Sequence, residues 1–200
     1  MKKFERLPAE ERKAEIMAAA LELFSKKGFS STTMENIVDE VTLSKGGVYR
    51  LYPSTLAILS DLIMGGMHMR NAYYAGRVAE ESGAGRPITL EFIVGMVTDS
   101  LMMAPEVSNL WSEFLWEKRR KPELEALYLE IEKKSIEETV ALIESTGASD
   151  ALEDGALTLG RLTEIMNAFT LGLSILGWKE DSPEFRSKLK EAIMAILEIR

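Results

Sequence analysis

Apolar residues recur every three to four positions along almost the whole chain. Ile16, Ala20 and Phe24 follow this spacing and mark one face of a first helix, because side chains three or four residues apart share a helix face. Gly28 can end this helix in the left-handed conformation, with Phe29 folding back onto its last turn. No segment alternates with period two for long enough to form a strand. The pattern predicts an all-α protein of about nine helices.

Two short helices follow the first, with only a tight turn between them. Thr32 with Glu35 three residues later predicts a capping box at the start of one, and Ser44 can cap the other, which Pro53 ends. Two short helices joined so tightly cannot lie parallel. Such a pair behind a longer helix is typical of a helix-turn-helix, in which the second member enters the major groove of DNA. The later helices are expected at 54–82, 87–103, 105–120, 122–146, 151–178 and 183–199.

Charge is unevenly distributed between the two ends of the chain. The net charge of the 200 residues is −8, which taken whole disfavours a nucleic-acid partner. Residues 1–50 nevertheless hold nine Lys and Arg against eight Asp and Glu, so the acidity belongs to residues 51–200. This step in composition is a first sign of two functional parts.

The third helix carries the chemistry of a DNA-binding surface. Lys45 and Arg50 can neutralise phosphates, and the Tyr49 hydroxyl can donate to a phosphate oxygen. Gly46 and Gly47 each cost about 1 kcal/mol relative to alanine in a helix, and the lack of side chains there would let the backbone approach DNA closely. An isolated Ser-Lys-Gly-Gly is more often a flexible loop. Its place between a capped helix and a proline-ended one favours a recognition helix.

These segments resemble a known family. Residues 32–38, 44–49 and 52–54 look like the DNA-binding domain of TetR-type repressors, and the likeness extends over residues 11–62. It implies a DNA-binding domain at residues 1–53 and a ligand-binding and dimerisation domain at residues 54–200. It also implies backbone contacts by Thr33, Lys45 and Tyr49, and base-edge contacts near Gly46, Gly47 and Arg50. The full set of expected DNA-binding residues is Thr32, Thr33, Ser44, Lys45, Gly46, Gly47, Tyr49, Arg50, Tyr52 and Thr55.

Three positions depart from the pattern of these repressors. Thr42 stands where glycine is preferred in the turn, Leu51 where an aromatic residue or histidine is common, and Thr55 where a lysine usually meets phosphate. Because each neutralised phosphate steepens the salt dependence of DNA affinity, we expect less salt-sensitive binding than in a relative with both phosphate contacts.

Residues 56–150 are rich in methionine and aromatic side chains. Methionine adapts its shape, so such an interior can repack around varied guests, although methionine also serves as ordinary core filler. The resemblance implies a cavity for a small apolar effector. The candidate ligand-binding residues are Met64, Met67, His68, Phe92, Met96, Trp111, Phe114 and Tyr128. His68 is the only histidine and cannot build a metal site alone, so neither a metal nor a cofactor is expected.

The last two expected helices carry continuous apolar stripes. They could be ordinary core helices. The resemblance implies instead that they pair with their copies in a homodimer, which sets two recognition helices one DNA turn apart on a palindromic operator. The candidate dimerisation residues are Leu162, Ile165, Phe169, Gly172, Leu173, Leu176, Leu189, Ile193 and Ile196.

Several other functions are disfavoured. The chain lacks cysteine, which excludes disulfides and thiolate chemistry, and it lacks the glycine-rich, G-x-S-x-G and H-E-x-x-H motifs of common enzymes. The N-terminus has no apolar leader, and no apolar run approaches the ~18 residues of a membrane span, so a cytoplasmic protein is expected. The main hypothesis is a repressor released from its operator by an effector. The alternative is a helical protein-interaction or small-molecule-binding module without DNA affinity, which the net acidity favours.

Overall fold

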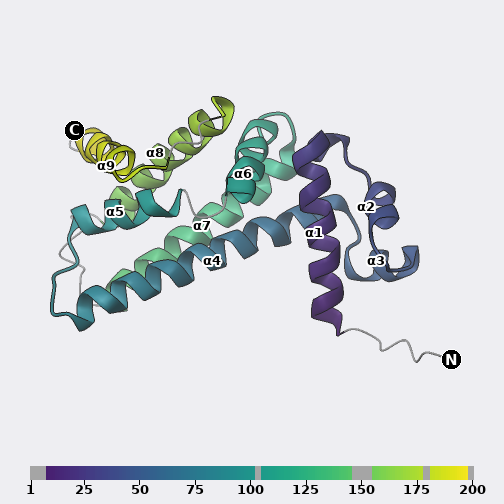
Figure 1. Cartoon of the computed structure of the whole chain (residues 1–200), viewed down its shortest axis with the longest axis horizontal. Coiled ribbons are helices and arrows are strands. Elements are labelled where there is room, and N and C mark those ends of the chain that lie inside the picture. Colours follow the sequence, from purple (N-terminus) through teal and green to yellow (C-terminus); the bar gives the residue numbers. More distant parts are fainter. Residues whose placement is uncertain (1–7, 102–104, 146–154, 178–180, 198–200) are drawn as a thin grey trace. The chain divides into compact units, whose positions relative to one another are not determined.

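The computed structural model describes residues 8–101, 105–145, 155–177 and 181–197 (Figure 1). Every regular element within these ranges is helical, and no strand occurs in them. The all-α prediction is therefore confirmed. The chain divides into two compact units, Met1–Gly65 and Gly66–Arg200. This division lies inside a long helix, whereas the expected domain boundary after residue 53 precedes that helix.

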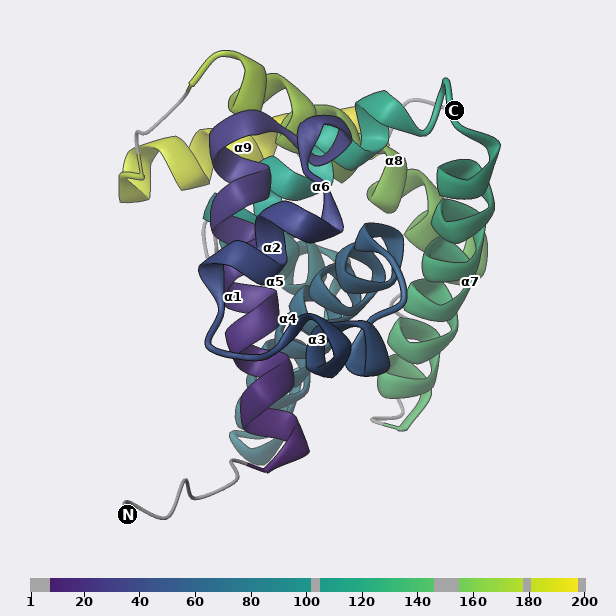
Figure 2. The same cartoon turned by 90° about the vertical axis from the view of Figure 1, so that its right-hand side faces the viewer.

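The first unit is built from a long helix and two short ones. It contains α1 (Ala9–Lys27), a 3-10 turn η1 (Phe29–Ser31), α2 (Met34–Glu40), α3 (Lys45–Leu51) and the first turns of α4 (Thr55–Gly83). α1 packs against α2, and α2 against α3 (Figure 2). The buried apolar side chains of this unit are Ile16, Ala20, Phe24, Met34, Ile37, Val48, Tyr52, Ile58, Leu59, Leu62 and Ile63.

The end of α1 follows its sequence signals. Gly28 has φ 85° and ψ 151°, a conformation that only glycine adopts readily, and its N–H donates to the Phe24 carbonyl at 2.9 Å. Phe29 folds back as predicted, with its ring 5.3 Å from that of Phe24 in an edge-to-face arrangement. The 3-10 turn that follows was not predicted.

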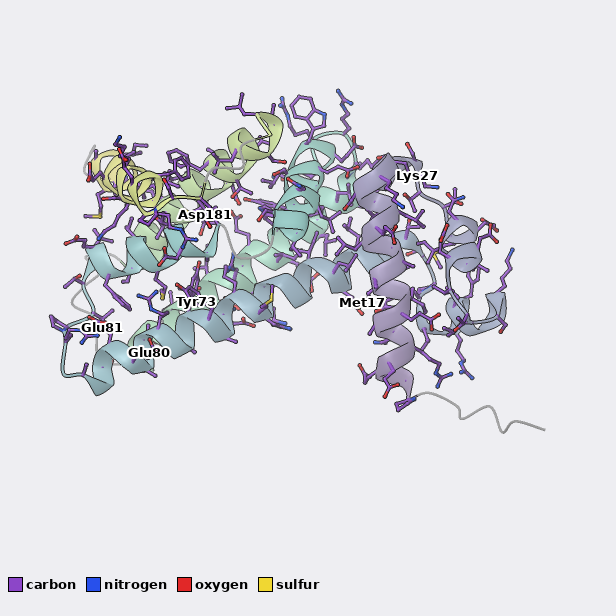
Figure 3. The ribbon with its side chains drawn as sticks, viewed as in Figure 1. Met17, Lys27, Tyr73, Glu80, Glu81 and Asp181 are labelled. Carbon is purple, nitrogen blue, oxygen red and sulfur yellow. The ribbon has the colours of Figure 1, made fainter. Side chains whose placement is uncertain are left out.

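The cap of α2 lies one residue later than predicted. Thr33, not Thr32, is the N-cap: its hydroxyl accepts from the Asn36 N–H, and the Asn36 side chain accepts from the Thr33 N–H. Thr32 is buried, and its hydroxyl donates to the Gly28 carbonyl at 2.9 Å. Lys27, labelled at the end of α1 in Figure 3, donates to Asn36 Oδ1 at 2.6 Å. The predicted box of Thr32 with Glu35 is therefore wrong, since burial of Thr32 shifts the cap to its neighbour.

The second unit contains the remainder of α4 with α5 (Leu90–Ser100), α6 (Pro105–Glu117), α7 (Pro122–Ser145), α8 (Gly155–Ile175) and α9 (Pro183–Leu197). α6 packs on α8, and α5 on α9. A helix start was expected at Pro87, but α5 begins after Thr89, whose hydroxyl accepts from the Phe92 N–H at 3.1 Å. One core cluster joins α4, α5, α8 and α9: Tyr74, Val78, Ile88, Ile93, Val94, Met96, Val97, Leu162, Leu189 and Ile193.

Candidate nucleic-acid interface

The helix α3 presents one polar, basic face. The Ser44 hydroxyl caps it by accepting from the Gly47 N–H at 3.2 Å, as predicted. Val48 is fully buried and fixes which way the helix faces. Lys45, Tyr49 and Arg50 are all exposed. The three side chains that sequence reasoning assigned to DNA therefore point away from the core of this unit.

The turn before α3 is held by the first helix. Glu15 of α1 accepts a hydrogen bond from the backbone N–H of Thr42, with 2.6 Å between Oε1 and N. This contact joins residues 27 positions apart and ties the turn to the long helix on which α2 packs. Sequence reasoning missed Glu15, because no local signal distinguishes it from the other acidic residues of α1. It is a positioning residue for α3.

Lys45 is already engaged by a carboxylate of the same unit. Its Nζ lies 3.0 Å from Glu35 Oε1 and 5.8 Å from the centre of the Tyr49 ring. Hydrogen bonding in this pair lowers the pKa of Glu35 and raises the pKa of Lys45, so both groups carry charge at neutral pH. A phosphate would have to replace Glu35 as the partner of Lys45. Sequence reasoning had given Glu35 to the helix cap and missed this role.

Two expected DNA-binding residues do not reach the surface. The Tyr52 side chain is only 2% exposed, and its hydroxyl donates to Asp61 Oδ2 at 2.9 Å. Burial, and then this bond, raises the pKa of Tyr52. Thr32 is buried beside Gly28, as described above. Both residues hold the unit together, and the resemblance over these positions is one of packing. The hydroxyls of Thr33 and Ser44 serve as caps, and Thr55 is half-buried.

The two glycines of α3 differ in their surroundings. A Cβ added at Gly46 would meet no other atom within 4 Å, whereas one added at Gly47 would lie 3.3 Å from Ser44 Oγ. The fold of this unit thus gives a reason for a small residue at position 47. It gives none for position 46, where the space that glycine leaves opens to the surroundings of the protein.

The candidate ligand-binding residues do not form one cluster in the described structure. Trp111, Phe114 and Tyr128 lie together, with ring centres 5.2 to 6.5 Å apart, and the Trp111 ring N–H donates to Asn167 Oδ1. Phe92 and Met96 belong instead to the core that joins α5, α8 and α9. The remaining three candidates are spread along α4: Met64 is half-buried in the first unit, while Met67 is buried and His68 exposed in the second.

The candidate dimerisation residues fall into three groups: buried, exposed and half-buried. Leu162, Leu189 and Ile193 are buried within the single chain as members of its core cluster. Near the end of α8, Ile175 and Leu176 are 68% and 75% exposed. Ile196 on α9 is exposed as well, and the other candidates, Ile165, Phe169, Gly172 and Leu173, are half-buried. The apolar surface available for a partner thus lies mainly at the ends of the two helices.

No helix within the described residues is both long enough and apolar enough to cross a membrane. Among these same residues, no group of three or more metal-ligating side chains comes together.

The first unit is similar to segments of known proteins. Residues 16–62 match the family model described as bacterial regulatory proteins of the tetR family. The HTH-type transcriptional regulators YfiR and YuxN of Bacillus subtilis are 41% and 38% identical over 58 and 64 residues. The matched segments cover 29% and 32% of this chain. They cover 28% of YfiR and 20% of YuxN, so most of each relative lies outside the match.

The likeness to solved structures extends over nearly the whole chain. GusR of Salmonella enterica superposes with a TM-score of 0.68 at 20% identity, covering 99% of this chain and all of that one. A transcriptional regulator of Saccharomonospora viridis, solved in complex with choline, gives 0.63 at 16% identity, covering 96% of this chain and 97% of that one. At such identity these matches establish a common fold.

Proposed function

We propose that this chain, whose residues 16–62 match the tetR family of bacterial regulatory proteins, is a DNA-binding transcriptional regulator controlled by a small ligand. The matched family is one of regulators, not of enzymes. One observation carries the proposal. The helix α3 is capped by Ser44 and anchored by the buried Val48, and it presents Lys45, Tyr49 and Arg50 outward. Cations and a phenol on one exposed helix face suit the phosphate backbone and base edges of the major groove.

The test is binding to double-stranded DNA from upstream of the protein's own gene, measured by fluorescence anisotropy over a range of salt concentrations. We expect Lys45→Ala to weaken binding and to reduce the slope of log affinity against log salt by about 0.9, because one phosphate contact is lost. Lys188→Ala is the matched control, since Lys188 is also exposed and also paired with a glutamate, but lies in the second unit. Absence of salt-dependent binding by the unaltered protein would favour the alternative of a helical module without DNA affinity.

We also propose that the regulator acts as a homodimer on a palindromic operator. The exposed Ile175, Leu176 and Ile196 support this, because large apolar side chains left in water mark surfaces that pack against a partner. A twofold pair would set two copies of α3 about 34 Å apart, one turn of DNA.

The proposed control is release of a repressor from its operator by an effector bound in the second unit. The choline-bound regulator of S. viridis supports a small-molecule role for this fold. Only an effector with different affinities for the free and operator-bound states can shift the balance between them. Mass spectrometry of the denatured, purified protein should reveal a co-purifying molecule, and that molecule should lower operator affinity. Equal effector affinity for free and DNA-bound protein would exclude the coupling.

A further inference from the structure

The ammonium group of Lys118 lies directly on the ring of Tyr128. Lys118 follows the last residue of α6, and its Nζ is 3.5 Å from the centre of the Tyr128 ring on α7. The other contacts of lysine or arginine with aromatic rings in the described residues span 5.6 to 6.0 Å. Lys118 Nζ also donates to Glu125 Oε2 at 3.2 Å. An alkylammonium is thus held between an aromatic face and a carboxylate.

The Tyr128 ring is fixed by its neighbours. Its hydroxyl donates to Glu132 Oε1 at 2.6 Å and accepts from Asn167 Nδ2 at 3.4 Å. The ring centres of Trp111 and Phe114 lie 6.1 and 6.5 Å from its own. Burial, and then the bond to Glu132, raises the pKa of Tyr128, so the ring remains a neutral phenol at neutral pH. A fixed phenol that donates to a carboxylate presents an electron-rich face to a cation.

This contact is open to solvent on one side. The Glu125 side chain is 45% exposed, and that of Lys118 is 19% exposed. An ion pair with so exposed a carboxylate contributes little to stability, because water screens it and the long lysine side chain loses entropy when it is held in one position. Lys118 can therefore turn out into water, and a cation from solution can reach the position that its ammonium leaves.

The room for a ligand is the room that the Lys118 side chain fills. That side chain has a four-carbon stem and one nitrogen, the same number of heavy atoms as tetramethylammonium. A primary ammonium such as that of lysine is strongly hydrated, whereas a quaternary ammonium has no N–H to donate to water and is well suited to an aromatic face. A compact quaternary ammonium therefore matches this position in size and in charge.

We infer that the face of Tyr128, together with Glu125, is the binding site for an effector with a quaternary ammonium group, and that Lys118 occupies this site while the effector is absent. The effector displaces the Lys118 side chain from the ring. This inference rests on the proposed function and gives its effector a chemical class. It also replaces the sequence-based expectation of an apolar effector by that of an organic cation.

The test is titration calorimetry on the full-length protein without DNA, with choline and its uncharged isostere 3,3-dimethylbutan-1-ol as probes. We expect choline to bind about tenfold or more tightly than the alcohol, because the ring face and the carboxylate attract only the cation. Lys118→Ala should raise the affinity for choline about tenfold or more, because the internal competitor is removed.

Lys121→Ala is the matched control for the change in charge. Lys121 lies in the same connection between α6 and α7, and its Nζ is 3.4 Å from Glu117 Oε2. Its substitution removes the same charge and an ion pair of the same kind. It should therefore leave the affinity for choline nearly unchanged.

Two further substitutions, each made in the Lys118→Ala protein, assign the affinity to the two groups of the site. Tyr128→Leu should abolish the preference for choline over the alcohol, and Glu125→Gln should reduce it several-fold, since a charged contact becomes a neutral one. Should the protein with Tyr128→Leu fail to fold, Glu125→Gln still tests the site, because the Glu125 side chain is half-exposed.

Three results would overturn the inference: equal binding of choline and the alcohol, no gain in choline affinity in Lys118→Ala, or no saturable choline binding to either protein. The second is the result expected if Lys118 only stabilises the connection between α6 and α7. Because no DNA is present, these results are independent of whether the protein binds an operator. Operator binding without a preference for choline would contradict the inference alone, and choline binding without operator affinity would contradict the proposed function alone.

Discussion

Replacing Gly46 with alanine separates the needs of the fold from the needs of DNA binding. Gly46 is exposed in the first turn of α3, and an added Cβ would touch nothing within 4 Å. Glycine costs up to about 1 kcal/mol in a helix, so Gly46→Ala should raise the free energy of unfolding by about 0.5 kcal/mol, with a shift in Tm of about 1 to 2 °C. The fold of this unit therefore gives no reason for glycine at position 46.

The same methyl group would stand between α3 and the DNA. We assume that the backbone at position 46 lies in van der Waals contact with a phosphate or a base edge of the DNA. An added methyl group would then move the helix away from the DNA by about 1 Å, which would also lengthen the contacts of Lys45 and Tyr49 with DNA. We expect operator affinity to fall about tenfold or more, the loss of at least one charge-assisted hydrogen bond. Anisotropy titrations and thermal melts on the same preparation would measure both effects.

Gly76→Ala provides the control. Gly76 is likewise exposed in a helix with no atom within 4 Å of an added Cβ, but it lies in the second unit. It should gain stability without losing DNA affinity. If Gly46→Ala binds the operator as tightly as the unaltered protein, the idea of a recognition helix thinned by glycine is refuted.

Three further predictions address other parts of the structure. Tyr52→Phe removes a hydroxyl that is hydrogen-bonded to the half-exposed Asp61, so it should lower the free energy of unfolding by about 1 kcal/mol and leave operator affinity unchanged. Weaker DNA binding without a lower Tm would instead show that Tyr52 contacts DNA. Burial raises the pKa of Tyr52 and Tyr128 above the usual 10.0, so their neutral forms stabilise the fold below pH 10 and that stability is lost as the pH rises further. Ultraviolet titration should therefore show both phenols ionising late and together with unfolding, and a native circular dichroism spectrum with all five tyrosines ionised would contradict this. Leu176→Asp should shift the species seen by light scattering from a dimer towards 22.3 kDa, and a monomer before the substitution would exclude the dimer.

Local signals in the sequence determined the helices and most of their ends. Ser44 caps α3 as predicted, and Gly28 ends α1 with positive φ, because a cap depends only on residues within one turn. The motif around Thr33, Lys45 and Tyr49 carries the resemblance to the TetR family for the same reason: its residues lie close together in sequence. Helical periodicity is a property of each segment alone.

The tertiary structure decided which polar residues serve the fold and which remain free for a partner. Tyr49 and Tyr52 lie three residues apart in one short stretch, yet only the packing of the other helices buries Tyr52 and leaves Tyr49 outside. Likewise, either Thr32 or Thr33 could cap α2 by sequence alone, and the burial of Thr32 leaves Thr33 as the cap. The hydrogen bond between Arg70 and Ser135 joins two helices through residues that are 65 positions apart in sequence. Burial and long-range pairing depend on how helices meet in space, and a one-dimensional pattern does not contain that information.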